Sequence, residues 1–265
     1  MRLIVPKVSP GRYAAALFKE RLNKNKNLVL GLPTGETVVE MYAEFARMRK
    51  NGEVSFQNVK TFNLDEYAGI EACHPQSYCS FMRQIFLKHV DMKKENFFIP
   101  GGMAADIEKE CLDYEEKIKN AGGIDILFGG VGHNGHLAFN EPFSALRSRT
   151  HKVFLTKDTI LANSRFFTPP QTPPQTAITV GVGTILDARE IVILAAGFKK
   201  AEALRAAVEG PVCAKWVISA LQIHPKAVIV ADAAACSNLE PGTFEYFKNL
   251  KDEYSEIEKK CLSEK

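Results

Sequence analysis

Short apolar runs of strand length alternate with helical stretches along the chain, and this alternation restricts the fold more than any other feature. The runs lie at residues 3–5, 28–32, 59–62, 124–128, 191–195 and 227–230. Such alternation indicates a parallel sheet with helices on both faces. We therefore predict an α/β fold with an open, mostly parallel, doubly wound (Rossmann-like) sheet. The sequence has no repeat and no linker-like stretch, so we expect residues 1–265 to form a single domain.

Local signals place several helices between these runs. Ser9 followed by Pro10 is typical of a helix start, because serine suits the N-cap and proline the first turn. Residues 37–52 carry apolar side chains at helical spacing and end at a glycine. Ser77 is suited to cap a helix over residues 77–90, and residues 105–123 form an amphipathic pattern that also ends in glycine.

Charge and composition restrict the partners of the chain. Lys and Arg number 34 and Asp and Glu 31, so the net charge is only +3, which favours neither nucleic acid nor a membrane surface. The apolar run at the N-terminus is too short for a signal peptide, and no stretch approaches the roughly 18 apolar residues of a membrane span. We expect a cytoplasmic protein. Its six cysteines are scattered without a CxxC pair, which favours free thiols.

Four unusual polar segments each follow one of the apolar runs. They occupy residues 33–37, 64–67, 129–142 and 197–200. In an open parallel sheet, ligands bind at the carboxyl ends of the strands. These four segments are therefore expected to meet at one edge of the sheet and to form a binding site there.

The first segment contains Thr34, Gly35, Glu36 and Thr37 in a strand-to-helix turn. Main-chain N–H groups at such a turn, together with the positive end of a helix dipole, suit a phosphate. Ordinary capping of the helix uses the same residue types. The sequence alone leaves both interpretations open.

The third segment, GGVGHNGHLAFNEP, is the densest in chemistry. Glycines such as Gly130 and Gly132 let the main chain approach a ligand closely, although their spacing is not that of a dinucleotide-binding loop. A carboxylate from Glu141 beside the His136 imidazole would orient the ring and suit proton transfer near neutral pH. A metal pair is the alternative, but no third ligand stands at ligand spacing, so we expect no metal. His133 is expected to lie at the surface.

Three further residues are ambiguous when taken alone. Asp65 follows a strand, where a carboxylate can act as a base, but an N-cap for a following helix is the favoured interpretation. Arg165 and Lys200 are candidate cations for a phosphate. Single basic residues are more often solvated surface charges.

At these residues the chain resembles the glucosamine-6-phosphate deaminase family. The matching stretches include GLPTG at 31–35, VSFQNVKTFNLDEY at 54–67, GGVGHNGHLAFNEP at 129–142, ANSRFF at 162–167, TVGVGTILDA at 179–188 and WVISALQIHPKA at 216–227. They occur in the family's order over nearly the whole chain. The GHxAFNEP stretch is far more specific than a glycine-rich loop, and the related 6-phosphogluconolactonases lack its FNEP part.

The resemblance implies a role for each matching residue. Asp65 would be the base that moves a proton between C1 and C2 of the sugar, and His136, oriented by Glu141, would open the pyranose ring. Thr34 and Gly35, with Arg165 and Lys200, would hold the phosphate of an amino-sugar phosphate. The resemblance implies no metal and no organic cofactor.

The sequence departs from the family pattern at three places. Asn134 stands where some members have Asp. An amide can hydrogen-bond the imidazole but stabilises its charged form less well, so we expect Glu141 to carry that role alone. Glu36 replaces a small residue in the phosphate turn, so we expect its carboxylate to face water or a basic side chain. After the SRT motif, His151 and Val153 replace a basic pair, and Ala145 stands where allosteric members have serine; we expect no strong activation by N-acetylglucosamine 6-phosphate.

Two other functions remain as alternatives: a non-catalytic sugar-phosphate sensor and a 6-phosphogluconolactonase-like hydrolase. Sensors of this fold usually carry an added DNA-binding segment, and the FNEP stretch argues against the lactonase. The sequence leaves a homo-oligomer open. Residues 156–174, which are polar and rich in proline near their end, are expected to form a mobile lid.

Overall fold

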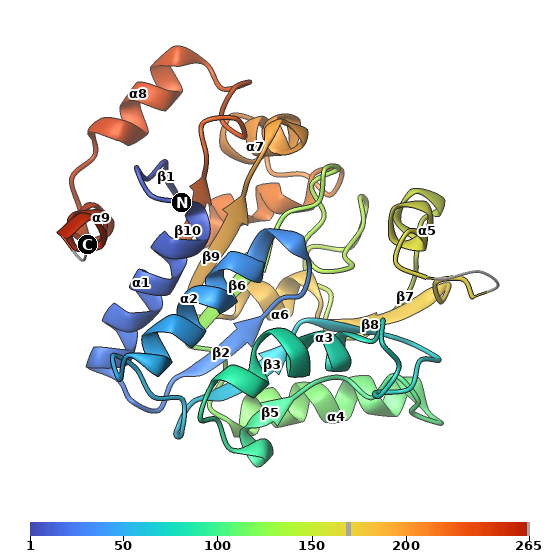
Figure 1. Ribbon diagram of the computed structural model, residues 1–265. Coiled ribbons are helices and arrows are strands. Elements are labelled where there is room, and N and C mark those ends of the chain that lie inside the picture. The colour runs from blue at the N-terminus through green and yellow to red at the C-terminus, as the bar shows by residue number, and fades with distance from the viewer. Residues whose placement is uncertain (168–170, 264–265) are drawn as a thin grey trace.

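The sheet expected from the apolar runs is present in the computed structural model, which describes residues 1–167 and 171–263. Within these residues a seven-stranded sheet has the order β1-β10-β9-β6-β2-β3-β5, and all neighbouring strands are parallel. Helices cover both of its faces (Figure 1). The strands are β1 (Arg2–Ile4), β2 (Val29–Leu32), β3 (Lys60–Asn63), β5 (Phe97–Phe98), β6 (Ile126–Gly130), β9 (Glu190–Ala195) and β10 (Ala227–Ala231).

The predicted doubly wound fold is confirmed. All six apolar runs form strands of this sheet, whereas β5 was not predicted because two residues are too few to show a pattern. Strands β2 and β6 are neighbours, and the chain continues from β2 toward β3 and β5 but from β6 toward β9 and β10. The winding direction therefore reverses between β2 and β6, which is where open α/β sheets bind their ligands.

Both faces of the sheet are buried, as expected for parallel strands. Along β9, Ile191 and Ile193 belong to one hydrophobic core, and Val192 and Leu194 belong to the other. The helices that form these layers and the outer parts of the described chain are α1 (Pro10–Lys24), α2 (Val39–Lys50), α3 (Tyr78–Ile85), α4 (Ile107–Asn120), α5 (Lys157–Ser164), α6 (Val182–Leu186), α7 (Ala201–Val208), α8 (Pro241–Asn249) and α9 (Glu253–Ser263). Short 3-10 turns precede or follow some of them: η1 (Glu36–Val38), η2 (Leu87–His89), η3 (Lys94–Asn96), η4 (Phe198–Lys200) and η5 (Val217–Ile223).

The predicted helix starts are mostly confirmed. The Ser9 hydroxyl accepts a hydrogen bond from the Arg12 N–H at the start of α1, and Ser77 does the same for Ser80 at the start of α3. The helix expected over residues 77–90 is shorter than predicted, because α3 ends at Ile85 and the chain continues as the η2 turn.

A second, smaller sheet was not predicted. It contains β4 (Asp65–Tyr67), β8 (Thr176–Thr179) and β7 (His151–Phe154), which pair in an antiparallel manner in the order β4-β8-β7. Figure 1 shows β7 and β8 on the side of the molecule away from both chain ends, with α5 nearby. Because Asp65 lies in β4 opposite Thr179, the favoured interpretation of Asp65 as a helix N-cap is wrong.

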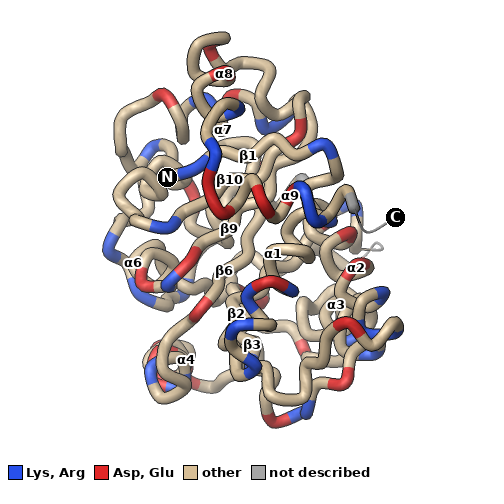
Figure 2. The backbone as a smooth tube through the Cα atoms, turned by 90° about the vertical axis from the view of Figure 1, so that its left-hand side faces the viewer, with Lys and Arg blue, Asp and Glu red and all other residues tan. Residues whose placement is uncertain are grey.

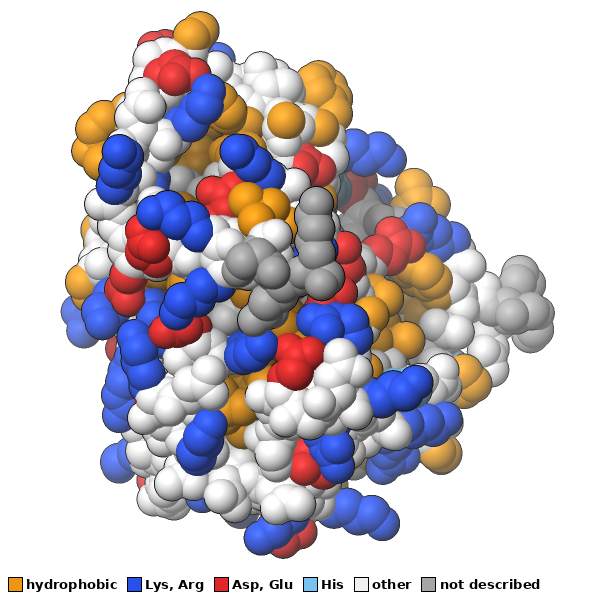
Figure 3. All heavy atoms as spheres, turned by 60° about the vertical axis from the view of Figure 1, so that its left-hand side comes forward, with side chains coloured by type: hydrophobic (Ala, Val, Ile, Leu, Met, Phe, Trp, Pro, Cys, Tyr) orange, Lys and Arg blue, Asp and Glu red, His pale blue; other side chains and the backbone are white. Residues whose placement is uncertain are grey.

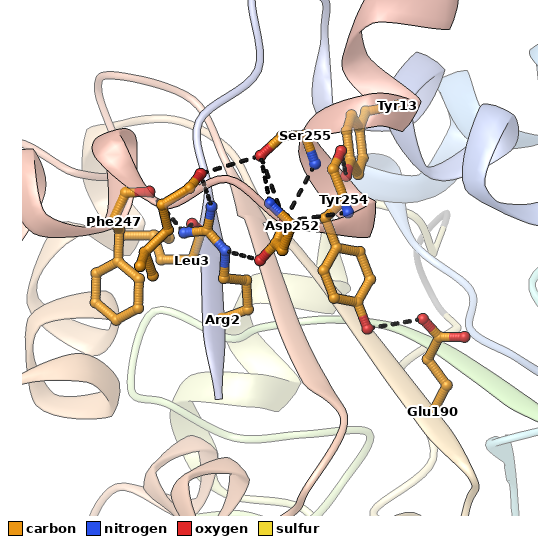
Figure 4. Close-up of polar contacts among 9 residues, drawn as sticks. Arg2, Leu3, Tyr13, Glu190, Phe247, Asp252, Tyr254 and Ser255 are labelled. Carbon is orange, nitrogen blue, oxygen red and sulfur yellow. Dashed lines mark hydrogen bonds and ion pairs between the residues drawn. The ribbon is translucent and has the colours of Figure 1, made fainter.

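The C-terminal helices are fastened to the start of the chain by polar contacts (Figure 4). Arg2 of β1 donates to Asp252 at 2.7 Å and to main-chain carbonyl oxygens at the end of α8. Tyr254 of α9 donates to Glu190 at 3.0 Å, and Arg21 of α1 binds both oxygens of Glu190 at 2.8 Å. The buried Glu190, the first residue of β9, therefore links β9, α1 and α9 at the end of the sheet opposite the polar segments.

Charged side chains of both signs are mixed over the surface, in keeping with the small net charge. Figure 2 shows Lys and Arg interspersed with Asp and Glu along the chain, and Figure 3 shows the two types side by side on one face. None of the helices in the described residues is long and apolar enough to cross a membrane.

Candidate active site

The four polar segments lie at the carboxyl ends of neighbouring strands, as predicted. Strands β9, β6, β2 and β3 are adjacent in the sheet, and each leads directly into one of the segments. The segments after β2 and β6 approach one another closely, since a Cβ at Gly130 would lie 3.9 Å from the Cβ of Thr37. The turn after β2 and the histidine-containing loop after β6 therefore border the same space.

The loop after β6 brings His136 and Glu141 together. His136 Nδ1 lies 3.6 Å from Glu141 Oε2, which is within ion-pair distance. Gly132 makes this possible, because a Cβ at that position would collide with the His136 ring. Non-glycine residues with positive φ are rare, and in the described chain they are Ala138 (φ 51°) and Phe143 (φ 74°), which lie on either side of Glu141. Backbone strain of this kind collects at functional sites.

Asn134 supports the carboxylate rather than the imidazole. Its Nδ2 donates to Glu141 Oε2 at 2.9 Å, and its Oδ1 accepts from the main-chain N–H of His136 at 3.3 Å. In the described structure Asn134 makes these contacts rather than the hydrogen bond to the imidazole that an amide could also form. His133 is exposed, in agreement with the sequence prediction.

Two threonines that sequence reasoning missed complete the surroundings of Glu141. The hydroxyl groups of Thr156 (3.3 Å) and Thr159 approach Glu141 Oε1. Burial by itself would raise the pKa of Glu141, but its contacts with His136, Thr159 and Asn134 outweigh burial and lower the pKa to about 2. Glu141 is consequently an anion over the physiological pH range, although it is only 8% exposed.

Asp65 lies in very different surroundings. It is 7% exposed, and its Oδ1 has no hydrogen-bond partner in the described part of the chain. Burial, and to a lesser extent the adjacent Glu66, raises the pKa of Asp65 to about 8. A carboxyl group with a pKa in this range accepts and returns a proton readily near neutral pH.

The neighbouring Glu66 has a structural role. Its carboxylate accepts hydrogen bonds from the main-chain N–H groups of Tyr67, Tyr78 and Cys79, each at 2.9 Å. Two of these groups belong to the first turn of α3, where a carboxylate is favourable. Glu66 thus anchors α3 against β4, and the strand direction sends the side chain of Asp65 away from it.

The turn after β2 leaves its main chain open to a ligand. Gly35 has a φ of +105°, which only glycine adopts easily, and a Cβ there would meet open space. The first turns of η1 and α2 have no side-chain cap, so ordinary capping does not account for Thr34 and Thr37. The turn after β9 repeats this geometry, with Gly197 at a φ of +85° immediately before η4.

Glu36, Arg165 and Lys200 lie together beside these turns. Arg165 Nη2 is 2.9 Å from Glu36 Oε1, and both side chains are more than half exposed. Burial and the nearby Lys199 lower the pKa of Lys200, while Glu36 opposes this effect. The expectation that Glu36 faces a basic side chain is confirmed.

The segment expected to be a lid is described only in part. Its first half forms the N-cap Thr156 and helix α5, which ends at the C-cap Arg165. Residues 168–170 lie outside the described residues. Among the described residues, no cluster of three or more His, Cys, Asp or Glu side chains is arranged to hold a metal ion.

Comparison with known proteins decides the family. Residues 9–231 match the model of the glucosamine-6-phosphate isomerases/6-phosphogluconolactonase family. The chain belongs to this family. The deaminase branch is represented by the glucosamine-6-phosphate deaminase of Parabacteroides distasonis, which is 51% identical over 91% of this chain and 90% of its own length. The enzyme of Treponema denticola is 51% identical over 86% of this chain and 84% of its own length.

Solved structures of the family agree. A monomeric glucosamine-6-phosphate deaminase is 38% identical, covers 90% of this chain and 100% of its own, and has a TM-score of 0.86. The 6-phosphogluconolactonase of Thermotoga maritima is 16% identical and covers 87% of this chain and 99% of its own, with a TM-score of 0.70. The likeness to the lactonase concerns the fold alone.

Proposed function

We propose that this chain converts D-glucosamine 6-phosphate and water into D-fructose 6-phosphate and ammonia, and catalyses the reverse reaction at high ammonia concentration. The observation that carries this proposal is a pair of carboxyl groups at the carboxyl ends of the strands, of which one stays ionised and the other can exchange a proton. Glu141 is held as an anion next to His136, whereas Asp65 is poised to exchange a proton. The reaction needs both groups, because ring opening and isomerisation are separate proton transfers.

Ring opening is assigned to His136. The imidazole takes the proton of the C1 hydroxyl and returns a proton to the ring oxygen as the bond between C1 and that oxygen breaks, which leaves an open-chain aldehyde. Glu141 stabilises the charged form of the ring during this transfer from a distance of 3.6 Å. Asn134 contributes indirectly, by holding Glu141 in place.

Isomerisation is assigned to Asp65. Its carboxylate removes the proton from C2 and delivers it to C1, while the C1 carbonyl oxygen gains a proton and the amine gives one up, so that C1 becomes an alcohol and the C2 amine an imine. Water then adds to the imine carbon, and ammonia leaves to give the ketone of fructose 6-phosphate. Because the pKa of Asp65 is about 8 in the free protein, the active, ionised form becomes more abundant as the pH rises toward that value.

The phosphate is assigned to the glycine turns after β2 and β9. Main-chain N–H groups near Gly35 and the side chains of Thr37, Arg165 and Lys200 would surround it. The phosphate takes no part in the bond changes. Its binding energy instead fixes C1 and C2 against Asp65.

The proposal favours a deaminase over the lactonase and the sensor. Relatives named as deaminases are about 51% identical over most of the chain, whereas solved structures named as 6-phosphogluconolactonases are 15–19% identical. A sensor needs no buried base, yet Asp65 is kept buried and partly unpaired at a cost in stability. We further propose a cytoplasmic enzyme that works without metal or organic cofactor.

The test is an assay of purified protein with glucosamine 6-phosphate in the presence of a metal chelator. Ammonia and fructose 6-phosphate should form in equal amounts. Binding of the sugar phosphate without turnover in either direction would favour the sensor, and hydrolysis of 6-phosphogluconolactone without ammonia release would favour the lactonase. Size-exclusion chromatography of the same sample addresses the homo-oligomer that the sequence left open, and titration with N-acetylglucosamine 6-phosphate tests the expected absence of strong activation.

A further inference from the structure

The two oxygens of Glu141 are held by different parts of the chain. Oε2 faces His136 and accepts from Asn134, both in the loop after β6. Oε1 faces the hydroxyl groups of Thr156 and Thr159 at the start of α5, which is remote in sequence. Glu141 and Thr159 are each 8% exposed, so water has little access to replace a lost hydroxyl group.

The number of available hydroxyl protons makes Thr159 the main hydrogen-bond donor from α5 to Glu141. The Thr156 oxygen accepts from the Thr159 N–H at 3.2 Å as the N-cap of the helix. Its single hydroxyl proton has two acceptors within reach, Thr159 Oγ1 at 3.1 Å and Glu141 Oε1 at 3.3 Å. The shorter contact leaves Thr159 to donate its own proton to Glu141, so the hydroxyl groups form a chain in which each bond strengthens the next.

The same helix is fastened to the site at its other end. Asn163 Nδ2 donates to the Tyr67 hydroxyl at 2.9 Å, on the strand that carries Asp65. Arg165, the C-cap of α5, contacts Glu36 in the phosphate turn. Eight helical residues span only about 12 Å, so one short rigid element touches the surroundings of Glu141, Asp65 and the phosphate turn.

We propose that Thr159 is a positioning residue for ring opening, which acts by fixing the Glu141 carboxylate so that Oε2 stays directed at His136. Thr156 assists by orienting the Thr159 hydroxyl. This role rests on the function proposed above. It places the support of the histidine relay on α5, the helix that also carries the phosphate-binding Arg165.

The direct test replaces Thr159 with Val, which keeps the branched shape and removes the hydroxyl group. Thr159→Ser restores the hydroxyl group, and Ser164→Ala is the matched control. Ser164 lies on the same helix, but its hydroxyl group bonds only to the main-chain oxygen of Leu161 in the described structure. Circular dichroism and the melting temperature establish that each variant is folded.

We expect Thr159→Val to lower kcat about tenfold or more, because hydrogen bonds to buried charged groups are among the strongest in proteins. KM should change by less than about threefold, since Thr159 is not among the residues assigned to bind the substrate phosphate. Thr159→Ser should recover most of kcat, and Ser164→Ala should resemble the wild type. An open-chain alditol analogue, 2-amino-2-deoxyglucitol 6-phosphate, should bind Thr159→Val as tightly as the wild type because it requires no ring opening.

A second measurement separates ring opening from isomerisation. Substrate carrying deuterium at C2 reports on the step assigned to Asp65. If Thr159→Val slows only ring opening, the deuterium effect on kcat/KM does not exceed that of the wild type. The proposal would be overturned by a larger deuterium effect in Thr159→Val than in the wild type, or by a kcat of Thr159→Val within twofold of the wild type. It would also be overturned if Thr159→Ser were as slow as Thr159→Val. Absence of turnover in the wild type would instead refute the proposed function, so the two failures are distinguishable.

Discussion

Glu36 places a carboxylate in the turn that we assign to the substrate phosphate, and its removal should improve substrate binding. In the structure Glu36 forms an ion pair of 2.9 Å with Arg165, one of the cations assigned to the phosphate. Before Arg165 binds the phosphate, this pair must break or be shared. Glu36→Gln keeps the shape of the side chain and removes its charge.

The magnitude follows from two small terms. An exposed ion pair contributes about 0.2–1 kcal/mol, and the Glu36 and Arg165 side chains are 72% and 63% exposed. If the carboxylate and a doubly charged phosphate are taken to be about 6 Å apart, their repulsion adds a further ~0.7 kcal/mol after screening at physiological salt. Together these contributions amount to about 0.9–1.7 kcal/mol, which corresponds to a fall in KM of roughly 5- to 18-fold.

The assay is initial-rate ammonia release at several concentrations of glucosamine 6-phosphate, at low and at physiological ionic strength. Glu36→Gln should lower KM with little change in kcat, and the difference from the wild type should shrink as salt rises. Glu116→Gln, which removes an exposed partner of Lys119 on α4, is the control for loss of a surface charge. An unchanged or higher KM in Glu36→Gln would refute the reasoning and would show that the pair with Arg165 helps to form the phosphate site.

Four further predictions concern the buried carboxyl groups of Asp65 and Glu190. Asp65→Asn should abolish turnover while preserving binding of the open-chain alditol phosphate; a rate near that of the wild type would remove Asp65 from the reaction. In the wild type, kcat/KM should rise with pH until about 8, where Asp65 ionises, and a profile already flat from pH 6 would contradict its raised pKa. Because the pKa of Asp65 is raised on folding, this residue favours the folded state below its ordinary pKa, and that contribution is lost as the pH rises toward 8. In chemical denaturation, the unfolding free energy of Asp65→Asn should therefore fall less than that of the wild type as the pH rises toward 8. Glu190→Ala should destabilise the protein by about 1.5–3 kcal/mol, because Arg21 loses its bidentate partner and keeps its contact with Glu253. Asp113→Ala, at an exposed position of α4, should be nearly neutral in the same melting experiment.

The large sheet was predictable because its strands are buried on both faces and therefore appear as continuous apolar runs. The small sheet was not, since β4 and β7 are three and four residues long and contain charged side chains. That gap had a direct consequence for Asp65. Without a strand at that position, a carboxylate after an apolar run is most simply interpreted as a helix cap.

The location of the candidate site was predictable for a topological reason, because polar segments after parallel strands must meet at one edge. Its supporting contacts were not. Glu141 and Thr159 are 18 positions apart, and Glu66 and Tyr78 are 12 apart, so neither pair has a helical or strand spacing that could reveal it. A threonine at a helix start is ordinary capping chemistry until the structure shows which carboxylate it faces.

The most direct test of the account is the stoichiometry of product formation from glucosamine 6-phosphate by the wild-type protein in the presence of chelator. We predict one ammonia and one fructose 6-phosphate for each substrate consumed, with His136→Gln and Asp65→Asn inactive under the same conditions. Equal activity in either variant, or sugar-phosphate binding with no ammonia released in the wild type, would contradict the assignment of ring opening and isomerisation to these two residues.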